Sequence, residues 1–305
     1  MLIQVAGYQG EASVHTRALR VLAKGLARAW PRARVEVEAD VTLRGHSGRS
    51  LFDSVERGER TVCYMASGYL ASRVPELALL DMPFAVDERT VALQALDGDV
   101  GQALASAVAA ATGFHVLAFW DNGLRHISNR VRPIRGPDDC RGLRIRTLDS
   151  PAYVATLEGL GFTPVVTDVR ELRGAVASGQ VDAQENPLTN FQLFELWHHH
   201  RFLSLTGHLF GIALLLCNRS WLKALDDIER KTLDDWVARA TARQRELARD
   251  EDERVLIDLR ATTVDILPVE SIDRQAMRSS VSRLWQEFGG RQAALFAAYR
   301  GDGAR

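Results

Sequence analysis

The chain has 305 residues, of which 46% are hydrophobic and 25% are charged, the ordinary balance of a globular protein. Its 38 Lys and Arg residues against 39 Asp and Glu residues leave a formal net charge of −1. The chain therefore lacks the positive field with which proteins attract nucleic acid or an anionic membrane. A chain of this length can bury a large core and favours two lobes over one.

The sequence shows neither a signal peptide nor a membrane span. Met1 leads directly into the apolar residues 2–6, without a basic region or a long apolar core. The purest apolar run, 212–217, is far shorter than the roughly 20 residues that a transmembrane helix needs. Read literally, this start predicts a cytoplasmic protein. A mature or truncated chain, or a misassigned start codon, would look the same.

Sequence motifs indicate no metal, redox or catalytic site. The cysteines Cys63, Cys140 and Cys217 are odd in number and lack C-x-x-C spacing, and apolar surroundings predict buried free thiols at Cys63 and Cys217. No G-x-G-x-x-G, Walker, H-E-x-x-H or G-x-S-x-G motif occurs, and the S-x-x-K match at 220–223 lacks its companion motifs. The adjacent histidines 198–200 would diverge on a helix, which predicts a solvated helix end rather than a metal site.

Strand and helix patterns alternate through the first part of the chain. Alternating or continuous apolar residues predict strands, and apolar residues at helical spacing predict helices. Pro83 interrupts the pattern because it cannot donate a backbone hydrogen bond to a sheet. The predicted strands are 2–6, 34–38, 61–65 and 115–120, and the predicted helices are 12–30, 50–57 and 91–110.

The second part of the chain repeats this alternation. Ser150 and Pro151 form a favoured helix start, with a capping residue followed by proline at the first helical position. The predicted strands are 124–129, 143–147, 162–166, 181–185 and 263–267, with strand-like stretches in 203–217, and the predicted helices are 150–160, 171–178, 226–260 and 272–299. Such alternation predicts an α/β protein with mostly parallel sheets. No linker rich in Pro, Gly or Ser separates two halves.

Three polar motifs lie on or at the ends of predicted strands. Arg125 starts an apolar strand just after a turn, and Arg144 and Arg146 share one face of another strand at a spacing of two. Asn186 precedes Pro187, which ends a strand and exposes the asparagine at its tip. Strand ends are where open α/β sheets bind ligands.

An arginine guanidinium is a planar fork that fits a carboxylate through two hydrogen bonds. Two such arginines with one asparagine amide would make a carboxylate receptor that needs no catalytic group. Surface salt bridging is the competing interpretation of an arginine whose position is unknown. Spacing alone does not decide between the two.

The order of these motifs resembles the solute-binding proteins of tripartite ATP-independent periplasmic (TRAP) transporters, the DctP family. The resemblance extends over nearly the whole chain. It is strongest at residues 68–70, 73–77, 81–84, 125–129, 142–147, 181–187 and 203–208. Several ordered matches are far more specific than any single motif.

The resemblance implies a two-lobed α/β fold that closes on its ligand like a Venus flytrap, with a long helix that touches both lobes. Residues 226–260 correspond to that helix. Lobe I is expected from residues 1–122 and 208–250, and lobe II from residues 123–207 and 251–305.

The same resemblance implies the roles of individual residues. Arg146 matches the arginine that forms the salt bridge to the ligand carboxylate, Arg125 a second arginine that contacts the ligand, and Asn186 the asparagine of the Gln-Glu-Asn-Pro motif. The positions through which the first lobe usually faces the ligand are Tyr8, Ala66, Ser67 and Tyr69. No catalytic residue, metal or cofactor is implied.

Three positions depart from the family pattern. Val169 replaces an aromatic residue that lies over the ligand in many relatives, so a stacking contact is expected to be lost. Ala66 stands where relatives that bind sialic acid carry a glutamate, which argues against that ligand. Arg173 replaces a common tyrosine, and its charge lies either near the ligand or in solvent.

The resemblance implies a non-enzymatic receptor, located in the periplasm, that captures a small organic acid and delivers it to a TRAP membrane permease without inserting into the membrane. The alternative is an α/β enzyme that acts on a carboxylate substrate, with Arg146 as the anchor and Asp182 or Glu185 as the acid or base. The enzyme interpretation lacks a nucleophile, a metal set and a cofactor loop. Turnover of a candidate acid would favour the enzyme, and stoichiometric binding without turnover would favour the receptor.

Overall fold

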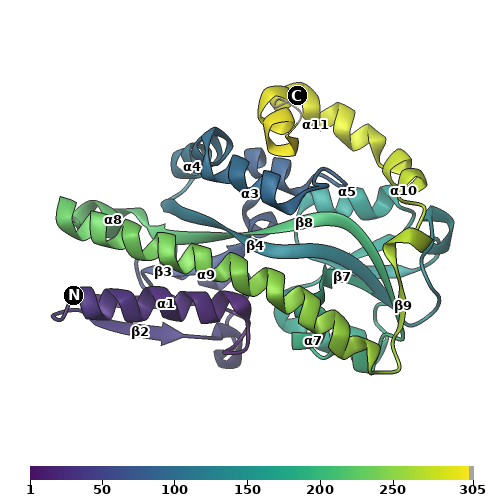
Figure 1. The fold of residues 1–305 in the computed structure, drawn as a ribbon, viewed down its shortest axis with the longest axis horizontal. Helices are drawn as coiled ribbons and strands as arrows, with labels where there is room; N and C mark the ends of the chain where they lie inside the picture. Colours follow the sequence, from purple (N-terminus) through teal and green to yellow (C-terminus); the bar gives the residue numbers. More distant parts are fainter. Residues whose placement is uncertain (302–305) are drawn as a thin grey trace.

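The computed structural model describes residues 1–301, with residues 288–291 described by their backbone alone. Within these residues, helices surround a nine-stranded sheet whose strand order is β2-β1-β3-β8-β4-β7-β5-β6, with β9 paired to β8 (Figure 1). The α/β architecture agrees with the sequence prediction.

The strands differ greatly in length, and two long ones occupy the middle of the sheet. The bounds are β1 Leu2–Ala6, β2 Arg34–Glu38, β3 Val62–Ala66, β4 Phe114–Asn129, β5 Arg144–Thr147, β6 Thr163–Val166, β7 Ala183–Pro187, β8 Phe202–Asn218 and β9 Asp265–Leu267. The central pairs β3–β8, β4–β8 and β4–β7 are antiparallel, whereas the flanking pairs are parallel. The expectation of parallel pairing is therefore wrong at the centre of the sheet.

The helices follow the predicted order, with one division and with two short helices, α7 and α8, that were not predicted. The bounds are α1 Val14–Ala29, α2 Gly48–Glu56, α3 Arg89–Asp97, α4 Asp99–Ala111, α5 Pro151–Gly159, α6 Leu172–Ser178, α7 Leu188–Leu193, α8 Arg219–Ala224, α9 Asp227–Arg260, α10 Arg274–Ser280 and α11 Ser282–Arg300. The helices expected through 91–110 are α3 and α4, which meet at Gly98, whose ψ of −144° is not helical. The helix expected over 272–299 divides at Val281.

The strands β4 and β8 connect the two halves of the molecule. They pair from Phe114 opposite Asn218 to Asn129 opposite Phe202, with register shifts between Val116 and Ala118, between Asp121 and Leu124 and between Arg125 and Ile127. Gly123 has a φ of +84°, a conformation that favours glycine. The turn predicted there is thus a bulge inside one continuous strand, because both flanking segments pair with the same partner β8.

The buried apolar side chains form separate clusters on the two sides of this crossing. One large cluster takes residues from β1, β3, α1 and the second half of β8, and two smaller clusters take residues from β5, β7, α5 and α6. Phe296 and Tyr299 of α11 belong to the large cluster, so the last helix returns to the first half (Figure 1). The exact lobe boundaries remain a prediction.

The helix α9 has 34 residues and runs along the molecule past α1, β4 and α7 (Figure 1). Its start is fixed by a capping box in which Asp226 and Glu229 each accept a hydrogen bond from the other's backbone N–H. The buried Gln244 accepts from the backbone N–H of Asp121 and donates to its carbonyl. The helix is thereby attached to β4 close to the bulge, as the long-helix prediction requires.

Two further sequence predictions concern cysteines and membrane spans. Cys63, Cys140 and Cys217 are all free and buried, which confirms the buried thiols expected at Cys63 and Cys217. Burial raises the pKa of the Cys217 thiol to about 12, so this thiol stays protonated and unreactive. In the described part of the chain, no helix is both long and apolar enough to cross a membrane.

The contact between α1 and α9 depends on Gly25, which has no side chain. A Cβ atom on Gly25 would lie 2.1 Å from Cδ2 of Trp236. We expect Gly25→Ala to reduce the free energy of unfolding by about 1–3 kcal/mol through overpacking, as measured by urea denaturation.

Gly174→Ala is the matched control, because Gly174 also lies in a helix, α6, but a Cβ atom there would meet no atom within 4 Å. This variant should unfold like the wild type or be more stable by up to about 1 kcal/mol. Equal stability of the two variants would contradict the packing described for α1 and α9.

Candidate functional site

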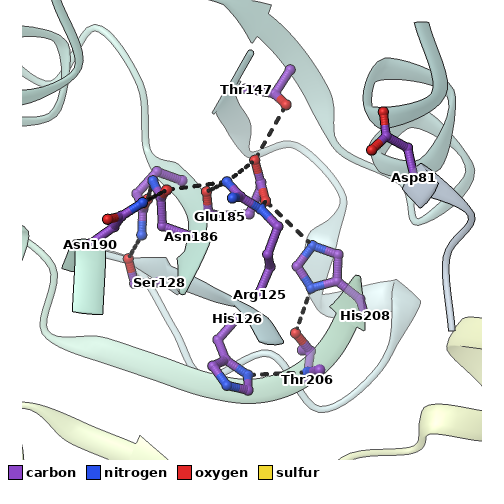
Figure 2. A network of polar contacts seen from close by, with 12 residues as sticks. Asp81, Arg125, His126, Ser128, Thr147, Glu185, Asn186, Asn190, Thr206 and His208 are labelled. Carbon is purple, nitrogen blue, oxygen red and sulfur yellow. Dashed lines mark hydrogen bonds and ion pairs between the residues drawn. The ribbon is translucent and has the colours of Figure 1, made fainter. Parts of the chain in front are cut away.

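Arg125 and Glu185 form a buried ion pair between β4 and β7. The guanidinium Nε and Nη2 donate to the two carboxylate oxygens, Nη2 at 3.0 Å from Oε1, and Nη2 also donates to the backbone carbonyl of Glu185 at 2.8 Å (Figure 2). Only 2% of Arg125 and none of Glu185 is exposed. The ring of Tyr153 lies 5.3 Å from the guanidinium.

The opposite charges of the two side chains nearly cancel, so the ion pair has almost no net charge. Burial alone would lower the pKa of Arg125, but the carboxylate of Glu185 more than offsets burial, so the pKa is raised. His208 Nε2 lies 3.8 Å from the same carboxylate, yet burial lowers the pKa of His208 well below its usual value and leaves it neutral. The negative charge of Glu185 is thus balanced by Arg125 and not by His208. The positive charge of Arg125 is in turn largely balanced by Glu185.

A chain of amide side chains leads from this pair to the first half of the molecule. Asn186 Oδ1 accepts from Arg125 at 3.2 Å and from Asn190 Nδ2 at 3.3 Å, and its own Nδ2 donates to Gln184 at 2.6 Å. Asn190 Oδ1 accepts in turn from Gln9 Nε2 at 2.9 Å. Gln9 follows β1, so this chain links the two halves across their boundary.

Arg146 lies on β5 and is buried, with 2% of its surface exposed. Its Nε and Nη2 donate to the backbone carbonyl of Thr167 at 3.0 and 2.6 Å. No carboxylate among the described residues forms an ion pair with it; the interactions found for its guanidinium are with the Thr167 carbonyl and the Tyr69 hydroxyl. Arg146 is therefore a buried positive charge that lacks a negative partner.

Arg144 lies on the same strand as Arg146 but at the surface. Its side chain is 48% exposed and makes an ion pair with Asp182 at 2.9 Å. The spacing of two residues predicts a shared face correctly. The structure adds that β5 enters the protein between the two arginines, so that only Arg146 is buried.

Of the residues expected to face the ligand from the first half, two interact with the positive charge of Arg125, and they are Tyr8 and Tyr69. Tyr8 and Tyr69 have raised pKa values because of burial, which the positive charge of Arg125 partly opposes at both. Ser67 is buried, but its hydroxyl donates to Asp81 at 3.3 Å. Ala66 ends β3 and is buried.

A cavity of about 490 Å³ adjoins Arg146. Its lining includes Tyr69 and Thr167, the two residues that contact the guanidinium, though not Arg146 itself. Residues of both halves contribute, and they are Ser47, Arg49, Phe52, Asp53, Tyr69, Leu70, Ser72, Arg73, Asp149, Val166, Thr167 and Asp168. The volume falls in the range of small-molecule sites.

The comparison with known proteins fits this geometry. A family model described as bacterial extracellular solute-binding protein, family 7 (DctP), matches residues 15–292. The chain belongs to this family. A solute-binding protein of Verminephrobacter eiseniae is 29% identical over 79% of this chain and 71% of its own length.

Solved structures confirm the two-lobed fold of this DctP-family chain. A TRAP periplasmic solute-binding protein from Polaromonas sp. JS666, bound to D-erythronate, superposes with a TM-score of 0.92 at 24% identity over 98% of both chains. Another from Sulfurospirillum deleyianum, with bound succinate, gives a TM-score of 0.90 at 24% identity, again over 98% of both chains.

The departures from the DctP pattern have structural outcomes. Arg173 is exposed and forms an ion pair with Glu195, so its charge points to solvent. Val169 is half-buried and packs against the large apolar cluster of the first half.

The histidine prediction is partly wrong. His198 and His199 are exposed, but His200 is buried and shares a hydrogen bond of 2.9 Å with the hydroxyl of Ser128. Within residues 1–301, no group of three or more His, Cys, Asp or Glu side chains could hold a metal ion.

Asp81 is the site residue that sequence reasoning missed. It is 1% exposed and accepts from Ser67 Oγ at 3.3 Å and from Ser150 Oγ at 3.1 Å, without a cationic partner among the described residues. Ser150 stands at the predicted helix start but bonds to Asp81 instead of capping α5. The motif Asp-Met-Pro-Phe marked this position, but only the fold brings Ser150 to it.

Burial raises the pKa of Asp81 to about 7, although the two serine hydroxyls oppose the shift. The folded protein then holds a proton that the unfolded chain releases, so this contribution to stability is full below about pH 4 and is lost as the pH rises toward 7. Asp81→Asn does not titrate. We expect the variant to gain on the wild type by up to about 1.4 kcal/mol per pH unit across this window.

Urea denaturation of both proteins at several pH values measures this difference. Asp121 and Asp252 also have pKa values raised by burial, but they are present in both proteins and cancel. Parallel stability curves for the wild type and Asp81→Asn would show that Asp81 is ionised in the folded state.

Proposed function

We propose that this solute-binding protein is a receptor for a small organic acid whose carboxylate binds Arg146. The observation that carries the proposal is the buried guanidinium without a carboxylate partner among the described residues. A buried charge is unfavourable unless it is paired. An anionic ligand would supply the missing partner. Thr167 is a neutral carbonyl partner on the Nε and Nη2 edge of the guanidinium and does not balance its charge.

Arg125 is proposed to contact the ligand without anchoring its charge, because Glu185 already compensates it. Asn186, Tyr69 and Tyr8 lie beside the arginines and are proposed as further contacts. Ser67 would act through Asp81, to which its hydroxyl donates.

We also propose that the protein performs no turnover. The two carboxylates that an enzyme would use as acid or base are already committed to ion pairs, Glu185 with Arg125 and Asp182 with Arg144. The hydrogen bond from Arg144 lowers the pKa of Asp182, which suits an ion pair better than a proton donor. Proton NMR of a candidate acid mixed with the protein would show new resonances if the enzyme alternative were correct.

We propose the membrane partner and the cellular location of the protein from its membership of the family. Relatives named as periplasmic binding proteins support a site of action outside the cytoplasmic membrane and delivery of the ligand to a TRAP permease. The genomic DNA upstream of Met1 tests export: an in-frame basic region with an apolar core is expected, and an immediate stop codon would remove that route. Native mass spectrometry of the purified protein would identify a copurifying acid.

Arg146→Ala should weaken binding of that acid. Truncation of one partner in a buried charged pair typically costs about 2–5 kcal/mol, which corresponds to roughly 30-fold to several thousand-fold in Kd. Arg146→Lys should recover only part of the loss, because an ammonium keeps the charge but not the fork. Isothermal titration calorimetry measures all three proteins.

Arg144→Ala is the control within the same strand, since Arg144 is exposed and paired with Asp182. It should bind nearly as the wild type does. Loss of binding in Arg144→Ala with normal binding in Arg146→Ala would move the carboxylate site to the surface end of β5.

The ligand should also close the two lobes, proposed as 1–122 with 208–250 and 123–207 with 251–305. Contacts across the boundary, such as those of Gln9 with Asn190 and of Ser150 with Asp81, can form together only when the two halves meet. Small-angle X-ray scattering should show a smaller radius of gyration with saturating ligand. An unchanged profile would argue against closure.

A further inference from the structure

We infer that Asp81 is a proton-binding site at the junction of the two halves, and that the protein takes up one proton there when it closes on its acid. This inference rests on the proposed function, and it adds a proton to the acid as a second ligand. Three observations carry it: the position of Asp81 between the halves, the close packing around it, and the charges of its neighbours among the described residues.

The Asp81 carboxylate accepts hydrogen bonds from both halves. Ser67, which follows β3 in the first half, donates to Oδ1 at 3.3 Å. Ser150, which precedes α5 in the second half, donates to Oδ2 at 3.1 Å. Asp81 and Ser67 belong to the same half, so the bond from Ser150 is the one that crosses the boundary. Separation of the halves would therefore remove it.

The junction around Asp81 is packed closely. A Cβ atom on Gly68, in the first half, would lie 2.7 Å from Leu148 Cδ1 and 3.3 Å from Ser150 Cβ, both in the second half. The same atom would lie 3.2 Å from Asp81 Oδ2. Asp81 is consequently only 1% exposed. In the closure that we propose, this packing forms as the halves meet, and it transfers Asp81 from water to a buried position.

The charged groups on the neighbouring strands do not balance the charge of Asp81. The positive charge of Arg125 on β4 reaches Asp81, but Glu185 on β7 pairs with this guanidinium and opposes its effect. His208 on β8 lies beside the ion pair (Figure 2) and is neutral, because burial lowers its pKa well below the usual value. Asp81 therefore gains little from the cation nearest in the sheet.

The titratable groups on the neighbouring helices are neutral as well. They are Tyr153 of α5 and Tyr299 of α11, and burial raises the pKa of both hydroxyls above the usual value. A buried carboxylate that lacks a cationic partner is more stable when it is protonated. The surroundings of Asp81 thus favour the neutral acid once the halves have met.

Closure changes the proton affinity of Asp81. In the open protein the carboxylate would meet water and keep the ordinary pKa of an aspartate, about 3.9, whereas burial raises its pKa to about 7. Between these values closure takes up a proton, so each unit of rising pH should weaken binding of the acid by up to about tenfold. Below about pH 4 both states hold the proton and above about pH 7 neither does, so Kd levels off in both ranges.

Isothermal titration calorimetry of the full chain counts these protons. The probe is D-erythronate, which the Polaromonas protein binds, or the copurifying acid. It is titrated in cacodylate and in MES, two buffers without a carboxylate that differ in ionisation enthalpy, and the difference in heat gives the proton uptake. We expect close to one proton per ligand at about pH 5.5 and close to none at about pH 8.5.

Three variants assign the proton to Asp81. Asp81→Asn should take up no proton and should show a Kd that stays constant from about pH 5 to 7. Asp138→Asn is the matched control, because Asp138 is an exposed aspartate, and it should keep the uptake of the wild type. Ser150→Ala removes a hydrogen bond that lowers the pKa of Asp81, so its Kd should level off at a higher pH than in the wild type. A merely structural role of Asp81 would change Kd equally at every pH.

Binding of the acid by the wild type without proton uptake at about pH 5.5, or equal uptake in Asp81→Asn, would overturn this inference and leave the carboxylate receptor intact. Unchanged binding in Arg146→Ala would instead contradict the proposed function, while the proton count of the wild type would still test Asp81. The two failures are therefore distinguishable.

Discussion

The ion pair between Arg125 and Glu185 is the interaction on which the charge arrangement of the site depends. Both groups are buried, and the pair leaves almost no net charge. Without Glu185, two buried guanidinium groups would stand near each other, and their repulsion would disfavour the closed site. With it, Arg146 is the buried guanidinium that lacks a carboxylate partner among the described residues. This difference is why we propose Arg146 as the anchor of the ligand and Arg125 as a compensated neighbour.

The arrangement of the central strands explains why this ion pair is buried. Arg125 lies on β4 opposite Pro187, and Glu185 lies opposite Ile127, so the two side chains meet diagonally across one antiparallel pair. The strand β4 continues past the bulge at Gly123 into the first half. Arg125 lies on the β7 side of this bulge, where it pairs with Pro187.

The sequence predicted much of this fold because local patterns coincide with its elements. The capped start of α9 at Asp226 and the strand of Arg146 could be placed. The prediction that Pro187 ends a strand and exposes Asn186 is wrong, because Pro187 pairs with Arg125 within β7 and Asn186 is buried. The continuity of β4 could not, because Asn122 and Gly123 form a turn signal whose outcome depends on pairing with β8. Which of the two arginines, Arg125 or Arg146, lacks a charged partner depends on the position of Glu185 on the neighbouring strand. Residue spacing in the sequence does not reveal that contact.

Among the described residues, Asp81 and Arg146 are both buried without an oppositely charged partner, and they differ in how their charge can be relieved. Asp81 can take up a proton, because burial has already raised its pKa to about 7. Arg146 has no such route, since a guanidinium keeps its proton throughout the accessible pH range. Binding of a proton is therefore enough to neutralise Asp81 when the two halves close over it. In the closure that we propose, Arg146 would stay a buried positive charge until an anion binds, so the ligand rather than the solvent would stabilise the closed state.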